Sequence, residues 1–200
     1  MTVQAIRKLN NNRYVITLDN GEQFPLYRGE LSSMRIEEGE AIEASTYEHI
    51  MNDILPKRIR LSGLNLLKNR MYTEHQLRDK LVGRYYPDEI IDDAMEYFRD
   101  LKVIDDRRYC MDYYHCYSDT RSAKRLFNDL MKKGVNKSVI EEAYSEYSDS
   151  EGTVDEERQI LRLMEKRHYD SDSADTAERL KMRNYLYGKG YNMDLIINLT

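Results

Sequence analysis

The N-terminal part of the chain alternates apolar and polar side chains in short runs, which is typical of half-buried β-strands. We predict short strands over residues 3–8, 13–18 and 22–28. They are separated by NNN at 10–12 and by DNG at 19–21, and both sequences favour tight turns. Residues 40–47 predict either a further strand or the start of the first helix.

From about residue 48 the apolar positions recur every three or four residues, which indicates amphipathic helices. Thr73-Glu-His-Gln76 is a capping-box pattern and predicts the start of one helix. Pro87 predicts the start of the next, because proline suits the first turn of a helix. The apolar face of that helix comprises Ile90, Ile91, Ala94, Met95 and Phe98.

Later helices follow from the same signals. Asp105-Asp106 and Asn136 predict helix starts, and Gly134 predicts a helix end. Residues 148–153 predict a turn or linker, and Thr153-x-x-Glu156 is a second capping-box pattern. The predicted buried faces are Ile59, Leu64, Leu67 and Met71; then Tyr109, Cys110, Tyr113, Tyr114 and Tyr117; then Ala123, Leu126, Phe127, Leu130 and Met131.

One line of sequence recurs three times: LVGRYYPDEIIDDAM at 81–95, LMKKGVNKSVIEEAY at 130–144 and LYGKGYNMDLIINLT at 186–200. A period near 50 residues in a helical chain predicts tandem units that bury their faces against one another. We therefore expect a mainly α fold, with three-helix repeats in an elongated curved array and a small N-terminal β segment. The expected boundaries are 1–50 for the β segment and 51–105, 106–150 and 151–200 for the three repeats.

Composition fits a folded chain, because 40% of the 200 residues are hydrophobic and 34% are charged. The sequence has no apolar run of about 18 residues and no apolar signal core at its start, so we expect neither a membrane span nor secretion. Cys110 and Cys116 match neither a disulfide framework nor a CxxC pair, which favours the cytoplasm.

The net charge of −5 is unevenly distributed. Residues 57–133 carry 17 basic and 13 acidic side chains, whereas residues 134–157 carry 1 and 8. A positive middle in an acidic protein predicts an anionic partner for that part, and the alternative is a solvated helical surface of mixed charge.

Catalytic and metal-binding patterns are not found in the sequence. The four histidines fall on different predicted elements, and Gly188-Lys-Gly190 lacks the frame of a phosphate loop and predicts a helix end. Asp105-Asp106 is better explained by helix capping than by acid–base work. We therefore predict no enzymatic activity, no cofactor and no metal.

The remaining candidate for function is a basic surface. Its predicted members are Arg70, Arg78, Lys80, Arg84, Arg107, Arg108, Arg121, Lys124, Arg125, Lys132 and Lys133. Arg78 and Lys124 occupy nearby positions in their repeats, which favours a stripe. Some of these cations could instead form pairs on one helix, such as Glu74–Arg78 and Asp129–Lys133. Lys189 is the fourth residue of the third copy of the repeated line, the position that Arg84 and Lys133 occupy in the first two.

The order of these motifs resembles the RecX family of regulators of the recombinase RecA. The segment LNLLKNRMYTEHQLRDKLVGRYYPDEIIDDAMEYFRDLKVIDDRRYCMDYY carries the strongest likeness, and RLFNDLMKKGVNKSVIEEAY matches the family's second repeat. Departures are Tyr85 where glycine is usual, Ser118–Ser122 in place of a Gly-Pro-rich entry, and the polar insert at 170–175.

The resemblance implies that the protein binds RecA or the RecA–DNA filament. We also expect a monomer in the cytoplasm. It implies lower recombinase and ATPase activity of RecA, with weak direct contact to DNA. Two alternatives stay open at this point: a helical nucleic-acid-binding protein that acts without RecA, and a general helical scaffold for protein interactions.

Overall fold

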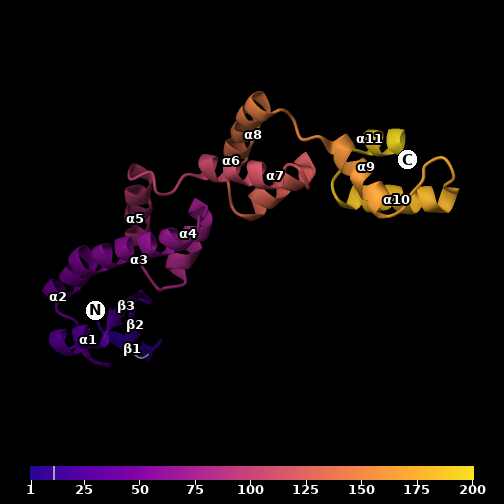
Figure 1. Ribbon diagram of the computed structural model, residues 1–200. Coiled ribbons are helices and arrows are strands. Elements are labelled where there is room, and N and C mark those ends of the chain that lie inside the picture. Colours follow the sequence, from indigo (N-terminus) through magenta and orange to yellow (C-terminus); the bar gives the residue numbers. More distant parts are fainter. Residues whose placement is uncertain (11) are drawn as a thin grey trace. The chain divides into compact units, whose positions relative to one another are not determined.

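The fold is mainly helical, with one small antiparallel sheet near the N-terminus, as predicted (Figure 1). The computed structural model describes residues 1–10 and 12–200. The chain divides into two compact units, Met1–Asp105 and Asp106–Thr200. Within the described residues, no helix is long and apolar enough to cross a membrane.

The three predicted strands form one sheet in the order β1–β2–β3. They are β1 (Val3–Lys8), β2 (Arg13–Leu18) and β3 (Gln23–Tyr27). The predicted turn at 19–21 joins β2 to β3, and Gly21 has the positive φ of 83° that such a turn needs. Residue 11 of the predicted turn at 10–12 lies outside the described residues.

A helix that the sequence did not predict follows the sheet directly. It is α1 (Arg28–Met34), and the Glu30 carboxylate at its start accepts a hydrogen bond of 2.7 Å from the Tyr27 N–H. For residues 40–47 the sequence predicted either a further strand or the start of the first helix, and each alternative is correct for part of the segment. Ala41 forms an isolated bridge with Thr2, and α2 (Ala44–His49) begins three residues later.

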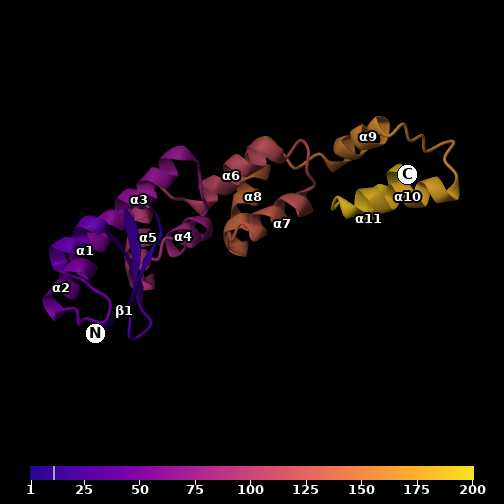
Figure 2. The same cartoon turned by 90° about the horizontal axis from the view of Figure 1, so that it is seen from below.

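The N-terminal sheet packs beside the first long helix. A π-helical turn, Ile50–Ile54, carries α2 into α3 (Leu55–Asn69), and the sheet lies along this helix in both ribbon views (Figures 1 and 2). The apolar core of this unit combines Leu18 and Phe24 of the sheet with Ile59 of α3. The β segment is therefore part of the core of the first unit.

The remaining helices form three groups of three. The first group is α3 with α4 (Glu74–Val82) and α5 (Asp88–Asp100). The second is α6 (Asp106–Tyr117), α7 (Ala123–Lys132) and α8 (Lys137–Glu151), and the third is α9 (Glu156–Lys166), α10 (Thr176–Gly188) and α11 (Met193–Leu199). The predicted tandem three-helix architecture is confirmed.

The recurring line of sequence forms the corner between the second and third helix of each group. Its fifth residue has a positive φ in all three copies: 65° at Tyr85, 81° at Gly134 and 94° at Gly190. The N-cap of the third helix follows two residues later, at Pro87, Asn136 and Asn192. The leucine that begins each line, Leu81, Leu130 or Leu186, is fully buried.

Some predicted boundaries and faces were wrong. Residues 148–151 belong to α8, and Asp155, rather than Thr153, caps α9 by accepting from the Arg158 N–H at 3.0 Å. Met71 lies beyond the end of α3 and is 48% exposed, and Met131 is 43% exposed. By contrast, the Thr73–Gln76 capping box and all five apolar positions of α5 are confirmed.

Polar groups join the second and third helical groups. The Gln159 side chain is buried, and its amide donates to the carbonyl oxygens of Ser118 at 2.6 Å and Arg121 at 3.3 Å. The Tyr191 hydroxyl donates to the same side chain at 2.8 Å. The Ser122 hydroxyl donates to the Lys189 carbonyl at 3.0 Å. These hydrogen bonds fix the start of α7 against the end of α10.

A glycine in α3 allows the close approach of α5. A Cβ added at Gly63 would lie 2.2 Å from Cζ of Phe98, a fully buried ring. We expect Gly63→Ala to lower the free energy of unfolding of the first unit by about 1–3 kcal/mol, because the ring must move in a filled core. Urea unfolding followed by circular dichroism measures the change.

Gly29→Ala in α1 is the matched control. Nothing lies within 4 Å of its added Cβ, so the higher helix propensity of alanine should stabilise the protein by up to about 1 kcal/mol. An unchanged unfolding midpoint for Gly63→Ala would contradict the close packing of α3 against α5.

Candidate cationic interface

The eleven predicted basic residues divide between the two units. Arg70, Arg78, Lys80 and Arg84 belong to the first unit. Arg107, Arg108, Arg121, Lys124, Arg125, Lys132 and Lys133 belong to the second. Arg78 and Lys124 belong to different units, so the stripe that was proposed from their positions in the repeats stays a prediction.

In the first unit, three of the four predicted cations have partners within the chain. Arg78 forms an ion pair with Asp92, a different partner from the predicted Glu74. The Arg70 guanidinium lies 4.2 Å from the centre of the Tyr72 ring. Arg84 is half-buried and donates to the Ser62 hydroxyl. Lys80 is exposed on α4.

A layer of arginine and tyrosine side chains joins the sheet to the first corner. Arg7 lies over the Tyr85 ring at 5.1 Å, and Arg13 lies over Tyr86 at 5.6 Å. Arg13 also donates to the Arg84 carbonyl oxygen at 2.6 Å. Burial lowers the pKa of the Arg13 guanidinium. These contacts make Arg84 part of the scaffold of the first unit.

In the second unit, one carboxylate serves two of the predicted arginines. Asp129 on α7 lies 2.8 Å from Nη1 of Arg121 and 3.1 Å from Nε of Arg125. Its side chain is only 13% exposed. The third paired arginine, Arg107, lies 2.6 Å from the Glu146 carboxylate on α8. The start of α7 therefore carries more positive than negative charge.

The hydroxyl of Tyr113 completes this network. It donates to Asp129 at 3.3 Å and accepts from Arg121. Burial raises the pKa of Tyr113 to about 12, with Arg121 acting in the opposite direction and Asp129 in the same direction. The neutral hydroxyl is therefore the form that the folded protein holds.

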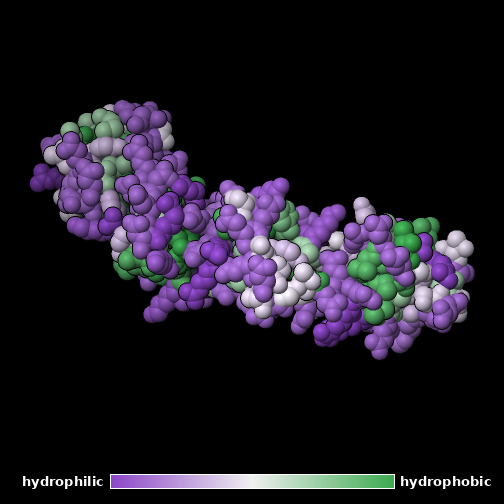
Figure 3. All heavy atoms as spheres, turned by 90° about the horizontal axis from the view of Figure 1, so that it is seen from above, coloured by the Kyte–Doolittle hydropathy of each residue, from purple (hydrophilic) through white to green (hydrophobic). Residues whose placement is uncertain are grey.

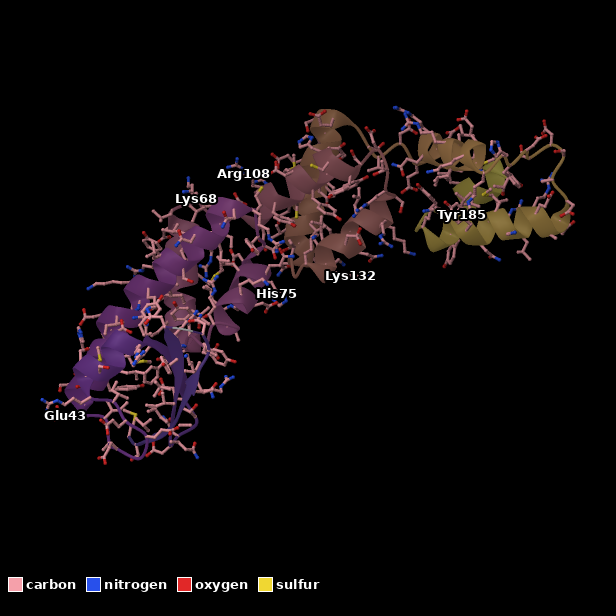
Figure 4. The ribbon with its side chains drawn as sticks, turned by 60° about the horizontal axis from the view of Figure 1, so that its bottom comes forward. Glu43, Lys68, His75, Arg108, Lys132 and Tyr185 are labelled. Carbon is pink, nitrogen blue, oxygen red and sulfur yellow. The ribbon has the colours of Figure 1, made fainter. Side chains whose placement is uncertain are left out.

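In the second unit, the exposed members of the predicted set lie on α6 and α7. Lys132 projects from the end of α7, and Arg108 is exposed near the start of α6 (Figure 4). Lys124 is exposed at the start of α7, with its ammonium 5.8 Å from the centre of the Tyr187 ring on α10. Lys133 is half-buried against the rings of Tyr109 and Tyr113.

The predicted set contained no residue of the third repeat, although this repeat contributes several cations. Arg167 and Lys189 lie 3.6 Å and 4.9 Å from the centre of the Tyr185 ring, which sits on the side of α10 that faces α9 (Figure 4). Partial burial raises the pKa of Tyr185, but hydrogen bonds from Arg167 and Lys189 lower it by a larger amount. The pKa of Tyr185 is therefore below its usual value. The positive balance of residues 158–200 was the available signal.

Each repeat also exposes an apolar side chain directly after its buried leucine. Val82, Met131 and Tyr187 are 48%, 43% and 53% exposed. Hydrophobic side chains also reach the surface over the third repeat, at the right-hand end of Figure 3. No group of three or more histidine, cysteine, aspartate or glutamate side chains is placed to hold a metal ion in the part of the chain that the structure describes.

Comparison with known proteins finds two matching family models. Residues 60–98 match the first three-helix domain of RecX, and residues 155–198 match its third. The regulatory protein RecX of Caldanaerobacter subterraneus subsp. tengcongensis is 26% identical over the full length of both chains. The chain belongs to the RecX family.

Other relatives agree with this assignment. A regulatory protein RecX of Clostridium botulinum is 24% identical over 98% of this chain and 92% of its own. A crystal structure of regulatory protein RecX has a TM-score of 0.62 and covers 97% of this chain, at 21% identity. RecX from Lactobacillus salivarius has a TM-score of 0.61 over 72% of this chain, at 23% identity. This chain therefore has the same fold as these two RecX structures.

The network around Tyr113 predicts how stability responds to alkaline pH. A tyrosine in an unfolded chain has a pKa of about 10, whereas burial in the folded protein raises the pKa of Tyr113 to about 12. The folded state therefore keeps this proton longer. The neutral Tyr113 hydroxyl should therefore contribute fully to the free energy of unfolding below a pH of about 10. This contribution should be lost as the pH rises to about 12.

Tyr113→Phe should make this decline shallower, because one late-ionising hydroxyl is removed. Urea unfolding at several pH values between about 9 and 11 measures the slope. Tyr187→Phe changes an exposed ring and should keep the parent slope. Equal slopes in all three proteins would contradict the role given to Tyr113.

Proposed function

We propose that this RecX-family chain binds RecA or the RecA–DNA filament and lowers the recombinase and ATPase activities of RecA. The observation that carries the proposal is the match, from end to end, with relatives named regulatory protein RecX. The proposed role is non-enzymatic and needs no cofactor. It places the protein in the cytoplasm, as a monomer, with RecA and DNA.

Tandem repeats suit a partner that is itself repetitive. Each repeat can contribute a weak contact, and linked weak contacts add through effective concentration. Exposed cations such as Lys80, Lys124 and Lys132 favour an acidic surface or DNA phosphate as the partner. The exposed Met131 and Tyr187 supply apolar contact area beside the cations of the second unit.

The first test is the ATPase activity of RecA on single-stranded DNA with this protein added below one copy per RecA. We expect the rate to fall and the protein to sediment with the filaments. In the double variant Lys124→Glu/Lys132→Glu, the reversed charges should repel an acidic partner and weaken both effects several-fold. Both side chains are exposed, so the fold should stay intact.

Lys137→Glu is the matched control for charge. Lys137 is exposed on α8 and pairs with Glu141, away from the start of α7, so this variant should inhibit RecA like the parent. An unchanged RecA rate together with no co-sedimentation of the parent protein would refute the proposal. Recovery of a different protein partner would then favour a general scaffold.

A further inference from the structure

A cleft of about 400 Å³ lies between the second and third repeats in the C-terminal unit. It lies where the start of α7 meets the end of α10. Its walls comprise Thr120, Arg121, Ser122, Arg125, Leu163, Gly188, Lys189 and Tyr191. This volume is within the range of about 300–1,000 Å³ that is typical of small-molecule sites.

Three of the residues that line the cleft are cations, and they come from different elements. Arg121 precedes α7, Arg125 is in its first turn, and Lys189 follows α10. Arg121 and Arg125 share the single carboxylate of Asp129. Among the described residues, no carboxylate lies within ion-pair distance of Lys189. The lining of the cleft therefore has an excess of positive charge.

Lys124 adds a further cation next to Arg125 in the first turn of α7, and its ammonium lies 5.8 Å from the centre of the Tyr187 ring on α10. One further carboxylate is near, since Glu156 accepts from the Ala123 N–H at 2.9 Å. Of the carboxylates, Asp129 forms ion pairs with Arg121 and Arg125, and Glu156 accepts a hydrogen bond from the backbone at the start of α7. A group with several negatively charged oxygens would balance this excess.

The backbone of the cleft is held by the polar contacts between the repeats. The Ser122 hydroxyl bonds the Lys189 carbonyl, and Gln159 bonds the Arg121 carbonyl. A Cβ added at Gly190 would lie 2.8 Å from the Ser122 hydroxyl, so the two chain segments are in close contact. The cationic side chains therefore project from a fixed frame, which reduces the entropy lost on binding.

We propose that this cleft binds a phosphate group through Arg121, Arg125 and Lys189. Guanidinium groups match the geometry of phosphate oxygens, and the lysine supplies a mobile point charge. Gly188-Lys-Gly190 ends a helix and is no phosphate loop, but this helix end presents Lys189 to the cleft. The phosphate could belong to a nucleic-acid backbone or to a free nucleotide or phosphate ion.

The inference does not depend on RecA, so its test uses the full chain alone. Fluorescence anisotropy follows a labelled oligothymidylate as protein is added at several salt concentrations. We expect binding by the parent protein and several-fold weaker binding by Arg125→Ala/Lys189→Ala. The slope of log K against log salt should also become shallower by about 0.7 for each lost phosphate contact.

The variants are chosen to keep the fold. The ion pair between Arg121 and Asp129 is kept in the double variant Arg125→Ala/Lys189→Ala. Equal thermal unfolding temperatures of the variant and the parent would verify that the unit is intact. Arg125→Lys retains a cation and should keep most of the affinity. Lys137→Ala removes an exposed cation from α8 and should leave both affinity and slope at parent values.

Competition distinguishes the two sources of phosphate. If inorganic phosphate displaces the oligothymidylate while chloride at equal ionic strength does not, the cleft accepts a free phosphate ion. If only unlabelled oligonucleotide displaces it, the cleft binds a phosphodiester backbone. Parent-like affinity and salt slope in Arg125→Ala/Lys189→Ala, or no binding by the parent, would overturn the proposal. Either result would leave the RecA experiment unaffected.

Discussion

The packing of each repeat depends on one backbone residue with positive φ. This residue ends the second helix and turns the chain so that the third helix starts two residues later. Glycine adopts this conformation at little cost, and Gly134 and Gly190 occupy the position in the second and third repeats. In all three repeats the leucine before the turn is buried, because the turn directs the next helix back across it.

The first repeat makes the same turn with Tyr85, for which this conformation costs about 1–2 kcal/mol. The neighbouring β segment offsets that cost. Arg7 of β1 lies over the Tyr85 ring, and Arg13 of β2 donates to the carbonyl of Arg84, the residue before it. The sheet therefore does more than enlarge the core of the first unit, because it holds a corner that the other two repeats make with glycine alone.

The helical pattern and the capping residues predicted most of the repeat architecture. Local signals such as Thr73–Gln76 and Asn136 act within one turn of chain, so they can be identified without knowing the tertiary structure. The failures have a different origin. At the start of α9, the capping-box pattern predicted Thr153 as the N-cap, whereas Asp155, which is also a residue type that caps helices, takes that place. Helix α1 is short and none of its residues is fully buried, so it leaves little periodic signal.

The basic site was harder to predict because a count of cations says nothing about their partners. Arg78 and Arg107 face carboxylates on other helices, Asp92 and Glu146, which are 14 and 39 residues away in sequence. Such pairs depend on tertiary packing. Lys189 was identified only by its place within the third copy of the repeated line. Its approach to Arg121 and Arg125 follows from how the repeats meet.

The contacts between the second and third repeats explain why the cationic cleft lies at their junction. The apolar cores of these repeats are separate clusters, and buried polar groups fill the space between them. Buried polar groups are stable only when their hydrogen bonds are made, so Gln159 and Tyr191 define one geometry for the junction. An apolar junction could slide. A hydrogen-bonded one fixes the cations on either side at a set separation, which recognition of a compact anion requires.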